Sequence, residues 1–125
     1  MGARILVVDD NEINLRLASV VLKTAGHAVA GAVDAEQALE MLRHFTPDLI
    51  LMDIALPGMD GLSLTRRLKA DERYRGVLIV ALTAFAMKGD EQKALDAGCD
   101  GYIAKPIDIR RLAQQVAEVM ARARP

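Results

Sequence analysis

The sequence predicts an α/β fold in which an open, five-stranded parallel sheet carries helices on both faces. Five short runs rich in apolar and β-branched residues alternate with helical patterns along the 125 residues. Strict alternation of this kind favours parallel strands joined by right-handed crossovers. Four of the runs are apolar throughout or nearly so, as in strands covered on both faces. The length fits a single domain over residues 1–125, because an eight-stranded barrel needs about twice as many residues.

The five predicted strands are short. The second contains a histidine and a glycine and is the weakest of the five, which favours a position at the edge of the sheet. The strands are RILVV (4–8), HAVAGAV (27–33), DLILM (48–52), VLIVAL (77–82) and GYIA (101–104).

Apolar residues at helical spacing predict two well-defined helices. The first covers residues 35–45, with Asp34 ahead of it as a plausible N-cap. The second covers residues 109–122, with Ile109 on its apolar stripe and Asp108 as its cap.

Three further features concern the remaining helices. Gly26 and Gly98 each follow a helical pattern and are expected to end it. The helix over residues 87–97 is the weakest, because it contains Gly89, many charges and only a thin apolar stripe. The helix over residues 13–25 has apolar residues over a wider arc than one core-facing stripe needs.

Composition excludes several classes of protein. The net charge is -1 and no basic arm is present, which gives no general attraction to nucleic acid. No apolar run reaches the roughly 18 residues of a membrane span, and no signal peptide is visible. The single cysteine, Cys99, is expected to be a packed thiol, and His27 and His44 are expected at the surface. We therefore expect a cytoplasmic domain with no nucleic-acid partner and no membrane insertion.

Polar residues collect where the predicted strands end. Asp9 and Asp10 follow the first strand, Asp53 the third, Thr83 the fourth and Lys105 the fifth. In an open α/β sheet ligands bind beyond the carboxyl ends of the strands, so these side chains should meet. Any one of them alone could be a helix cap or a solvated loop residue. Their coincidence at the ends of four separate segments favours a site.

Three carboxylates in one place repel each other, and a hard cation such as Mg²⁺ relieves that repulsion. A carboxylate can also attack phosphorus and form an aspartyl phosphate. Lys105 and Thr83 would then contact the phosphoryl oxygens, and Asp53, on the central run, is the natural acceptor. Nucleotide binding is disfavoured, because the first strand is followed by VVDDNEIN and not by a glycine-rich phosphate loop.

Four blocks of this sequence resemble the receiver domain of two-component response regulators. They are ILVVDDNEIN, PDLILMDIALPGMDG, ALTAFAMKGD and GCDGYIAKPI, in that order, and they span nearly the whole chain. The TAFAMKGD block and the length resemble the single-domain cell-division regulators of the DivK type. The resemblance implies a flavodoxin-like fold with strand order 2-1-3-4-5.

The resemblance also implies a role for each site residue. Asp53 would be phosphorylated by a histidine kinase or a histidine phosphotransfer protein. Asp10 would ligate Mg²⁺ directly, Asp9 through water, and Ala55 through its backbone carbonyl. Lys105 and Thr83 would contact the phosphoryl group, Thr83 and Tyr102 would act as the switch, and the Lys105–Pro106 peptide bond would be cis.

The wide apolar arc of the first helix suggests a docking face. Ile13, Leu15 or Val20 should be partly exposed there, and with Ile107 they would receive a kinase or phosphotransfer helix bundle. Scattered surface apolar residues are the alternative. The output face would be the fourth helix, fifth strand and fifth helix, and the protein would be a monomer or weak dimer.

Two residues beside the predicted site bear on the lifetime of the phosphoryl group. Ala55 and Phe85 flank the site and would position a hydrolytic water poorly, so we expect a long-lived phosphoryl state.

A receiver domain of a hybrid histidine kinase shares DDNEIN and stays an alternative. A phosphatase similar to the haloacid dehalogenase family needs a second acid two residues after Asp53, where Ala55 stands. A degenerate receiver acting only as a scaffold is disfavoured by the intact site. We therefore expect a phosphoacceptor that is not itself an enzyme.

Overall fold

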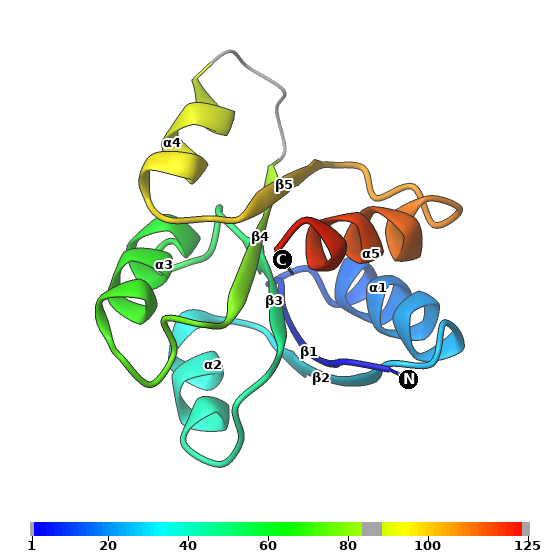
Figure 1. Cartoon of the computed structure of the whole chain (residues 1–125), viewed down its shortest axis with the longest axis horizontal. Helices are drawn as coiled ribbons and strands as arrows, with labels where there is room; N and C mark the ends of the chain where they lie inside the picture. The colour runs from blue at the N-terminus through cyan, green and yellow to red at the C-terminus, as the bar shows by residue number, and fades with distance from the viewer. Residues whose placement is uncertain (1, 84–88, 124–125) are drawn as a thin grey trace.

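The computed structural model describes residues 2–83 and 89–123. Five strands alternate with five helices in chain order (Figure 1). The elements are β1 (Arg4–Val8), α1 (Glu12–Thr24), β2 (Ala28–Ala32), α2 (Ala35–Leu42), β3 (Leu49–Asp53), α3 (Gly61–Ala70), β4 (Leu78–Thr83), α4 (Asp90–Asp96), β5 (Gly101–Ala104) and α5 (Leu112–Ala123). The five strands therefore lie where the apolar runs predict them.

The strands form one parallel sheet in the order β2-β1-β3-β4-β5, which confirms the predicted flavodoxin-like topology. The weak second strand lies at an edge, as predicted. In the register, Val8 lies beside Met52, and Asp53 lies beside Leu82. Because neighbouring parallel strands end at the same level, the residues after β1 and β3 emerge next to each other at one edge of the sheet.

Each face of the sheet carries its own apolar core. One core packs α2, α3 and α4 against side chains such as Leu6, Val8 and Ile50. The other packs α1 and α5 against Ile5, Val7 and Leu51. Figure 1 shows the two helical layers on opposite sides of the sheet. Consecutive residues from Ile5 to Val8 and from Leu49 to Met52 enter alternate cores, and this is why these two stretches are apolar at every position.

The end of α2 and the start of α4 differ from the predictions. The helix predicted over 35–45 ends at Leu42, and Phe45 lies beyond a turn but still packs against the core. Asp34 does cap this helix, since its Oδ1 accepts from the amide of Gln37 at 2.7 Å. The stretch predicted as weak helix over 87–97 becomes α4 only from Asp90, with Gly89 at its N-cap, and residues 87 and 88 lie outside the described residues.

The predicted start of the last helix is wrong. Residues 109–111 form a turn, α5 begins at Leu112, and Ile109 is 53% exposed instead of lying on the apolar stripe. The Oδ1 of Asp108 accepts from the amide of Arg110 at 3.0 Å and so stabilises this turn. A carboxylate that can cap either a turn or a helix makes the two indistinguishable in sequence.

The single residues follow the predictions with one correction. Gly26 and Gly98 follow α1 and α4 with φ of 98° and 106°, which ends both helices. Cys99 is buried, as predicted, whereas the surface prediction for His27 is wrong. His27 is half-buried and its Nδ1 accepts from the amide of Ala3 at 2.9 Å. His44 is exposed, as predicted.

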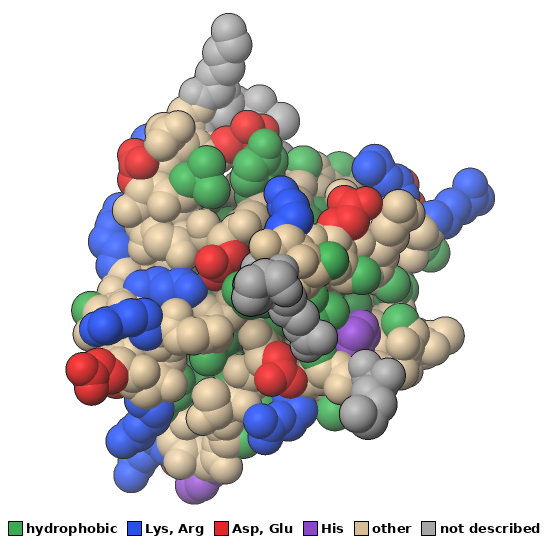
Figure 2. Space-filling model, viewed as in Figure 1, with side chains coloured by type: hydrophobic (Ala, Val, Ile, Leu, Met, Phe, Trp, Pro, Cys, Tyr) green, Lys and Arg blue, Asp and Glu red, His purple; other side chains and the backbone are tan. Residues whose placement is uncertain are grey.

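Charges are mixed on the surface. Figure 2 shows basic, acidic and apolar side chains interspersed over the face of the molecule seen in Figure 1. Among the described helices, none combines the length and apolar character that crossing a membrane requires.

Candidate phosphoacceptor site

An acid cluster lies beyond the ends of β1 and β3. One carboxylate oxygen from each of Asp9, Asp10 and Asp53 lies within 4.8 Å of the other two. Asp9 and Asp53 are 0% and 2% exposed, whereas Asp10 is exposed. Parallel register brings these residues together from segments more than forty positions apart. The predicted convergence of the three acids is therefore present in the structure.

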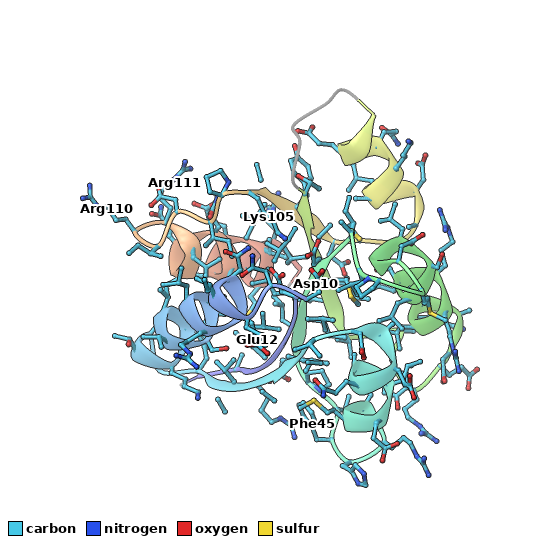
Figure 3. All side chains as sticks on the ribbon, turned by 180° about the vertical axis from the view of Figure 1, so that it is seen from behind. Asp10, Glu12, Phe45, Lys105, Arg110 and Arg111 are labelled. Carbon is cyan, nitrogen blue, oxygen red and sulfur yellow. The ribbon has the colours of Figure 1, made fainter. Side chains whose placement is uncertain are left out.

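Lys105 enters the cluster from the residue after β5. Its Nζ lies 2.8 Å from Oδ2 of Asp53 and 3.4 Å from Oδ2 of Asp9. Burial alone would lower the pKa of Lys105, but the hydrogen bond and charge of Asp53, with the charge of Asp9, outweigh it and raise the pKa. Figure 3 shows Lys105 and Asp10 near each other at this edge. The lysine is thus held as an ammonium against two carboxylates.

Lys105 is followed by a turn, and its backbone is hydrogen-bonded to the end of β4. The Lys105–Pro106 peptide bond is cis. The amide of Lys105 donates to the carbonyl of Thr83 at 2.7 Å, which ties the end of β5 to the end of β4. Thr83 is the last residue of β4 and is 1% exposed. Thr83 therefore ends β4 beside the backbone of Lys105, at the carboxyl end of the sheet, as the sequence predicts.

The charge of Asp9 is balanced only in part, because Asp9 shares the Lys105 ammonium with Asp53. Its Oδ1 accepts from the amide of Asn11 at 2.9 Å, and Asn11 itself caps α1 through bonds to the amides of Ile13 and Asn14. Its buried Oδ2 has no hydrogen-bond partner among the described residues, with Lys105 contributing charge at a longer distance. Burial raises the pKa of Asp9, and the neighbouring Asp53 adds to that rise.

Asp53 is held from two sides. Its Oδ2 faces Lys105, and its Oδ1 accepts from the amide of Ala55 at 2.9 Å. The loop after β3 therefore folds back over the carboxylate. Ala55 itself is exposed, and its backbone lies next to Asp53.

Gly61 lies close against the backbone of Asp53, and it is not among the residues that the sequence predicts for the site. A Cβ at this glycine would lie 2.2 Å from the carbonyl oxygen of Asp53 and 2.7 Å from Cα of Ile54. The Thr65 hydroxyl donates to the carbonyl of Gly61 at 2.8 Å, and Cys99 Sγ lies 3.9 Å from that hydroxyl. Nothing in the local sequence reveals this approach, because it depends on how α3 packs under the loop.

The donor set suits a hard divalent cation. All three candidate ligands are carboxylates, two are buried, and one buried oxygen lacks a hydrogen bond among the described residues. Mg²⁺ takes oxygen ligands and commonly uses one or two carboxylates. A single ammonium cannot balance three carboxylates, so the residues present fit the predicted magnesium ion.

Comparison with known proteins settles the family. The response regulator receiver domain model matches residues 5–117. The chain belongs to the receiver domain family. Polar-differentiation response regulator DivK of Brucella ovis is 39% identical over 123 residues, which cover 98% of this chain and 100% of that protein.

Solved structures give the same result for this receiver domain. Chemotaxis response regulator CheY4 of Vibrio cholerae superposes with a TM-score of 0.90 at 26% identity, covering 95% of this chain and 99% of that one. The signal receiver domain of a signal transduction histidine kinase from Syntrophus aciditrophicus has a TM-score of 0.87 at 28% identity, covering 98% and 93%. Receivers of both response regulators and kinases thus share this fold.

The remaining residues singled out by the sequence lie on β5, on α1 and in the segment after β5, except for one that is not described. Tyr102 on β5 is 42% exposed, and the neighbouring Glu91 of α4 raises the pKa of its phenol. Ile13 and Val20 on α1 are 70% and 56% exposed. Leu15 and Ile107 are half-buried and pack against the α1/α5 core. Phe85, predicted beside the site, lies outside the described residues.

Proposed function

We propose that this receiver domain accepts a phosphoryl group on Asp53 from a histidine kinase or a histidine phosphotransfer protein, and that phosphorylation switches its protein contacts. The supporting observation is the ion pair between Lys105 and Asp53 at 2.8 Å, beside the buried Asp9 and the exposed Asp10. A structural salt bridge alone would not need two further acids in the same place. Membership of the receiver family supports the same function.

The chemical step requires little of the protein beyond position and charge. A carboxylate oxygen of Asp53 attacks phosphorus, the P–N bond of a phosphohistidine donor breaks, and its electron pair stays on the imidazole nitrogen. The Ala55 amide orients Oδ1 of Asp53, and Lys105 leaves Asp53 Oδ2 to contact an incoming phosphoryl oxygen. The protein acts as a phosphoacceptor and is not a turnover enzyme.

Asp10 and Asp53 would hold Mg²⁺ directly, Asp9 through water and Ala55 through its carbonyl. When bound, the ion would neutralise charge on the phosphoryl oxygens. Asp9 would serve here without moving, because the Asn11 amide already fixes its Oδ1. The exposed Asp10 leaves one side of the cluster open to solvent and to a donor.

Thr83 and Tyr102 would form the switch. The Thr83 hydroxyl can bond a phosphoryl group only when one is present, so it biases an existing equilibrium between two conformations. Thr83 precedes the segment that leads into α4, and α4 has only seven residues with no side-chain cap. The exposed Tyr102 lies next to Glu91 of α4, and so the face of α4, β5 and α5 is our proposed output surface.

Docking of the phosphodonor would use α1 and the segment after β5. Ile13 and Val20 supply exposed apolar surface, and the half-buried Leu15 and Ile107 would border it. The exposed Ile109 extends the same apolar character. An exposed apolar group of this kind near a site commonly marks a protein interface.

Similarity to known regulators supports a proposal for the pathway. Similarity to the polar-differentiation response regulator DivK supports a proposed role in cell-cycle or cell-division control. The proposal includes a cytoplasmic location and no nucleic-acid binding, in keeping with the net charge of -1. Similarity to the receiver of a histidine kinase keeps a hybrid kinase as the alternative setting for the same chemistry. Ile54 and Ala55 after Asp53 disfavour an aspartyl-phosphate phosphatase, which needs an acid there.

Incubation with acetyl phosphate and Mg²⁺ tests the proposal. We expect an acid-stable, base-labile adduct on the wild-type protein that EDTA prevents and Asp53→Ala abolishes. Asp60→Ala removes an exposed capping carboxylate close by and should still be labelled. Equal labelling of wild type and Asp53→Ala would disprove Asp53 as the acceptor.

A further inference from the structure

The exposed side of α1 carries a row of large apolar residues. Ile13, Leu17 and Val20 are 70%, 43% and 56% exposed, and their spacing of four and three residues places them on one side of the helix. We call these three residues the α1 seam. Leu15, Ala18 and Leu22 face the core instead. The seam is therefore surplus to the packing of the domain.

Charged residues of opposite sign stand at the two ends of this helix. Glu12 lies in the first turn and Lys23 in the last, and Arg16 lies between them. At 100° per residue, all three fall on the same flank of the seam. A hollow between Glu12, Ile13, Arg16 and Leu17 lies on the helix surface. Figure 3 shows Glu12 at the end of α1 nearest to Asp10.

The α1 seam and the charges at its two ends can pair with the same surface of a second copy. When two α1 helices lie antiparallel about a two-fold axis near Leu17, each Ile13 comes opposite the partner's Val20, and the two Leu17 side chains meet. The same axis brings each Glu12 opposite the partner's Lys23, on the same flank of the seam. The hollow beside Ile13 can then receive Val20 of the second copy. The two Arg16 side chains also come close on this flank, one residue from the axis, and their repulsion limits the strength of the pairing. In a parallel pair the two charged flanks would lie on opposite sides of the seam, so Glu12 and Lys23 would face no charge of the second copy.

We propose that the α1 seam is a homodimer interface in which two copies pair through antiparallel α1 helices. The contact area of a single pair of helices is small, so the dimer should be weak and concentration-dependent. Because Ile13 and Val20 also belong to the proposed docking surface, a second copy and a phosphodonor would exclude each other. That last consequence rests on the proposed function, whereas the dimer itself does not.

Sedimentation velocity of the full chain, from about 20 µM to about 1 mM, tests the proposal. We expect the mean mass of the wild type to rise with concentration. Leu17→Asp places two like charges on the two-fold axis and should weaken association at least about tenfold. Leu95→Asp, which changes a similarly exposed leucine on α4, should associate like the wild type.

A charge exchange provides the second test. Glu12→Lys and Lys23→Glu should each weaken the dimer, and the double variant should restore it, because the pair is re-formed with its signs reversed. Far-UV circular dichroism establishes that each variant is folded. A monomer at every concentration, an undiminished Leu17→Asp dimer, dissociation by Leu95→Asp, or no recovery in the double variant would overturn the proposal. Labelling of Asp53 by acetyl phosphate should be unchanged in Leu17→Asp, so failure of the dimer leaves the phosphoacceptor proposal separately testable.

Discussion

The ammonium of Lys105 and the carboxylate of Asp53 lie 2.8 Å apart although 52 residues separate them in sequence. Both side chains are largely shielded from water, at 17% and 2% exposure. The pair brings the cation of the site to the carboxylate at its centre, and Asp9 lies within reach of the same ammonium.

Removal of the ammonium should slow phosphorylation. Lys105→Ala leaves the developing phosphoryl charge without its cation, and we expect labelling by acetyl phosphate to slow by about 10²–10³-fold. The rate of adduct formation at saturating Mg²⁺ measures this. Lys69→Ala is the matched control, since it removes another partly buried lysine, 2.9 Å from Asp100, in the last turn of α3. Similar rates for Lys105→Ala and Lys69→Ala would contradict the assigned role.

Neutralising Asp9 should stabilise the metal-free protein. Its buried Oδ2 has no hydrogen bond among the described residues, and it lies near Asp53. Asp9→Asn removes this repulsion, so the free energy of unfolding in EDTA should rise by about 1–2 kcal/mol. The stabilisation that Mg²⁺ gives the wild type should shrink. Urea unfolding with and without Mg²⁺ measures both.

Asp60→Asn is the control for the Asp9 variant. Asp60 is an exposed N-cap that accepts from the amide of Ser63, and asparagine caps about as well as aspartate. Its stability and its response to Mg²⁺ should therefore match the wild type. A destabilised Asp9→Asn protein in EDTA would show that the acid cluster is not under electrostatic strain.

Gly61 should tolerate no side chain. Its position has an ordinary φ, so the cost of Gly61→Ala arises from contact with the backbone of Asp53 and Ile54. We expect a loss of about 3 kcal/mol in unfolding free energy together with weaker Mg²⁺ binding. Gly76→Ala is the control, because a Cβ there meets no atom within 4 Å. Equal stability of the two variants would show that the loop relaxes freely.

The free energy of unfolding should fall at alkaline pH, because the thiol of Cys99 is buried. Burial raises the pKa of this thiol above its ordinary value of 9.0. A folded-state pKa above the unfolded one gives stability that is complete below pH 9 and is lost as the pH rises toward the folded pKa. The thiol should therefore contribute a slope of about 1.4 kcal/mol per pH unit in that window. Cys99→Ala should remove this slope, whatever its constant cost from the lost volume, and unfolding between pH 8 and 11 measures it.

The phosphoryl group should be long-lived. Ala55 follows Asp53 by two residues, is exposed and offers no polar side chain to a hydrolytic water. Ala55→Asn supplies one, and we expect dephosphorylation to accelerate about tenfold or more. Decay of the purified adduct after removal of acetyl phosphate measures it. Decay of the wild type at the rate of Ala55→Asn would refute the prediction.

Much of the fold can be predicted from local patterns. All five strands and the edge position of β2 follow from apolar runs and from the weak composition of HAVAGAV. The acid cluster also follows, because the topology sends the ends of parallel strands to one edge. Ile109 and His27 were placed wrongly, since an apolar residue can lie in an exposed turn and a histidine can accept a backbone hydrogen bond.

The sequence by itself determined the alternation of strands and helices and the position of Asp9, Asp10, Asp53, Thr83 and Lys105 at strand ends, because strand ends are local features. Only the tertiary structure decided which oxygen of Asp53 faces Lys105, which oxygen of Asp9 lacks a hydrogen bond, and why Gly61 has no side chain. These facts depend on distances between segments far apart in the chain. Such distances arise from packing of whole elements, and no short stretch of residues encodes them.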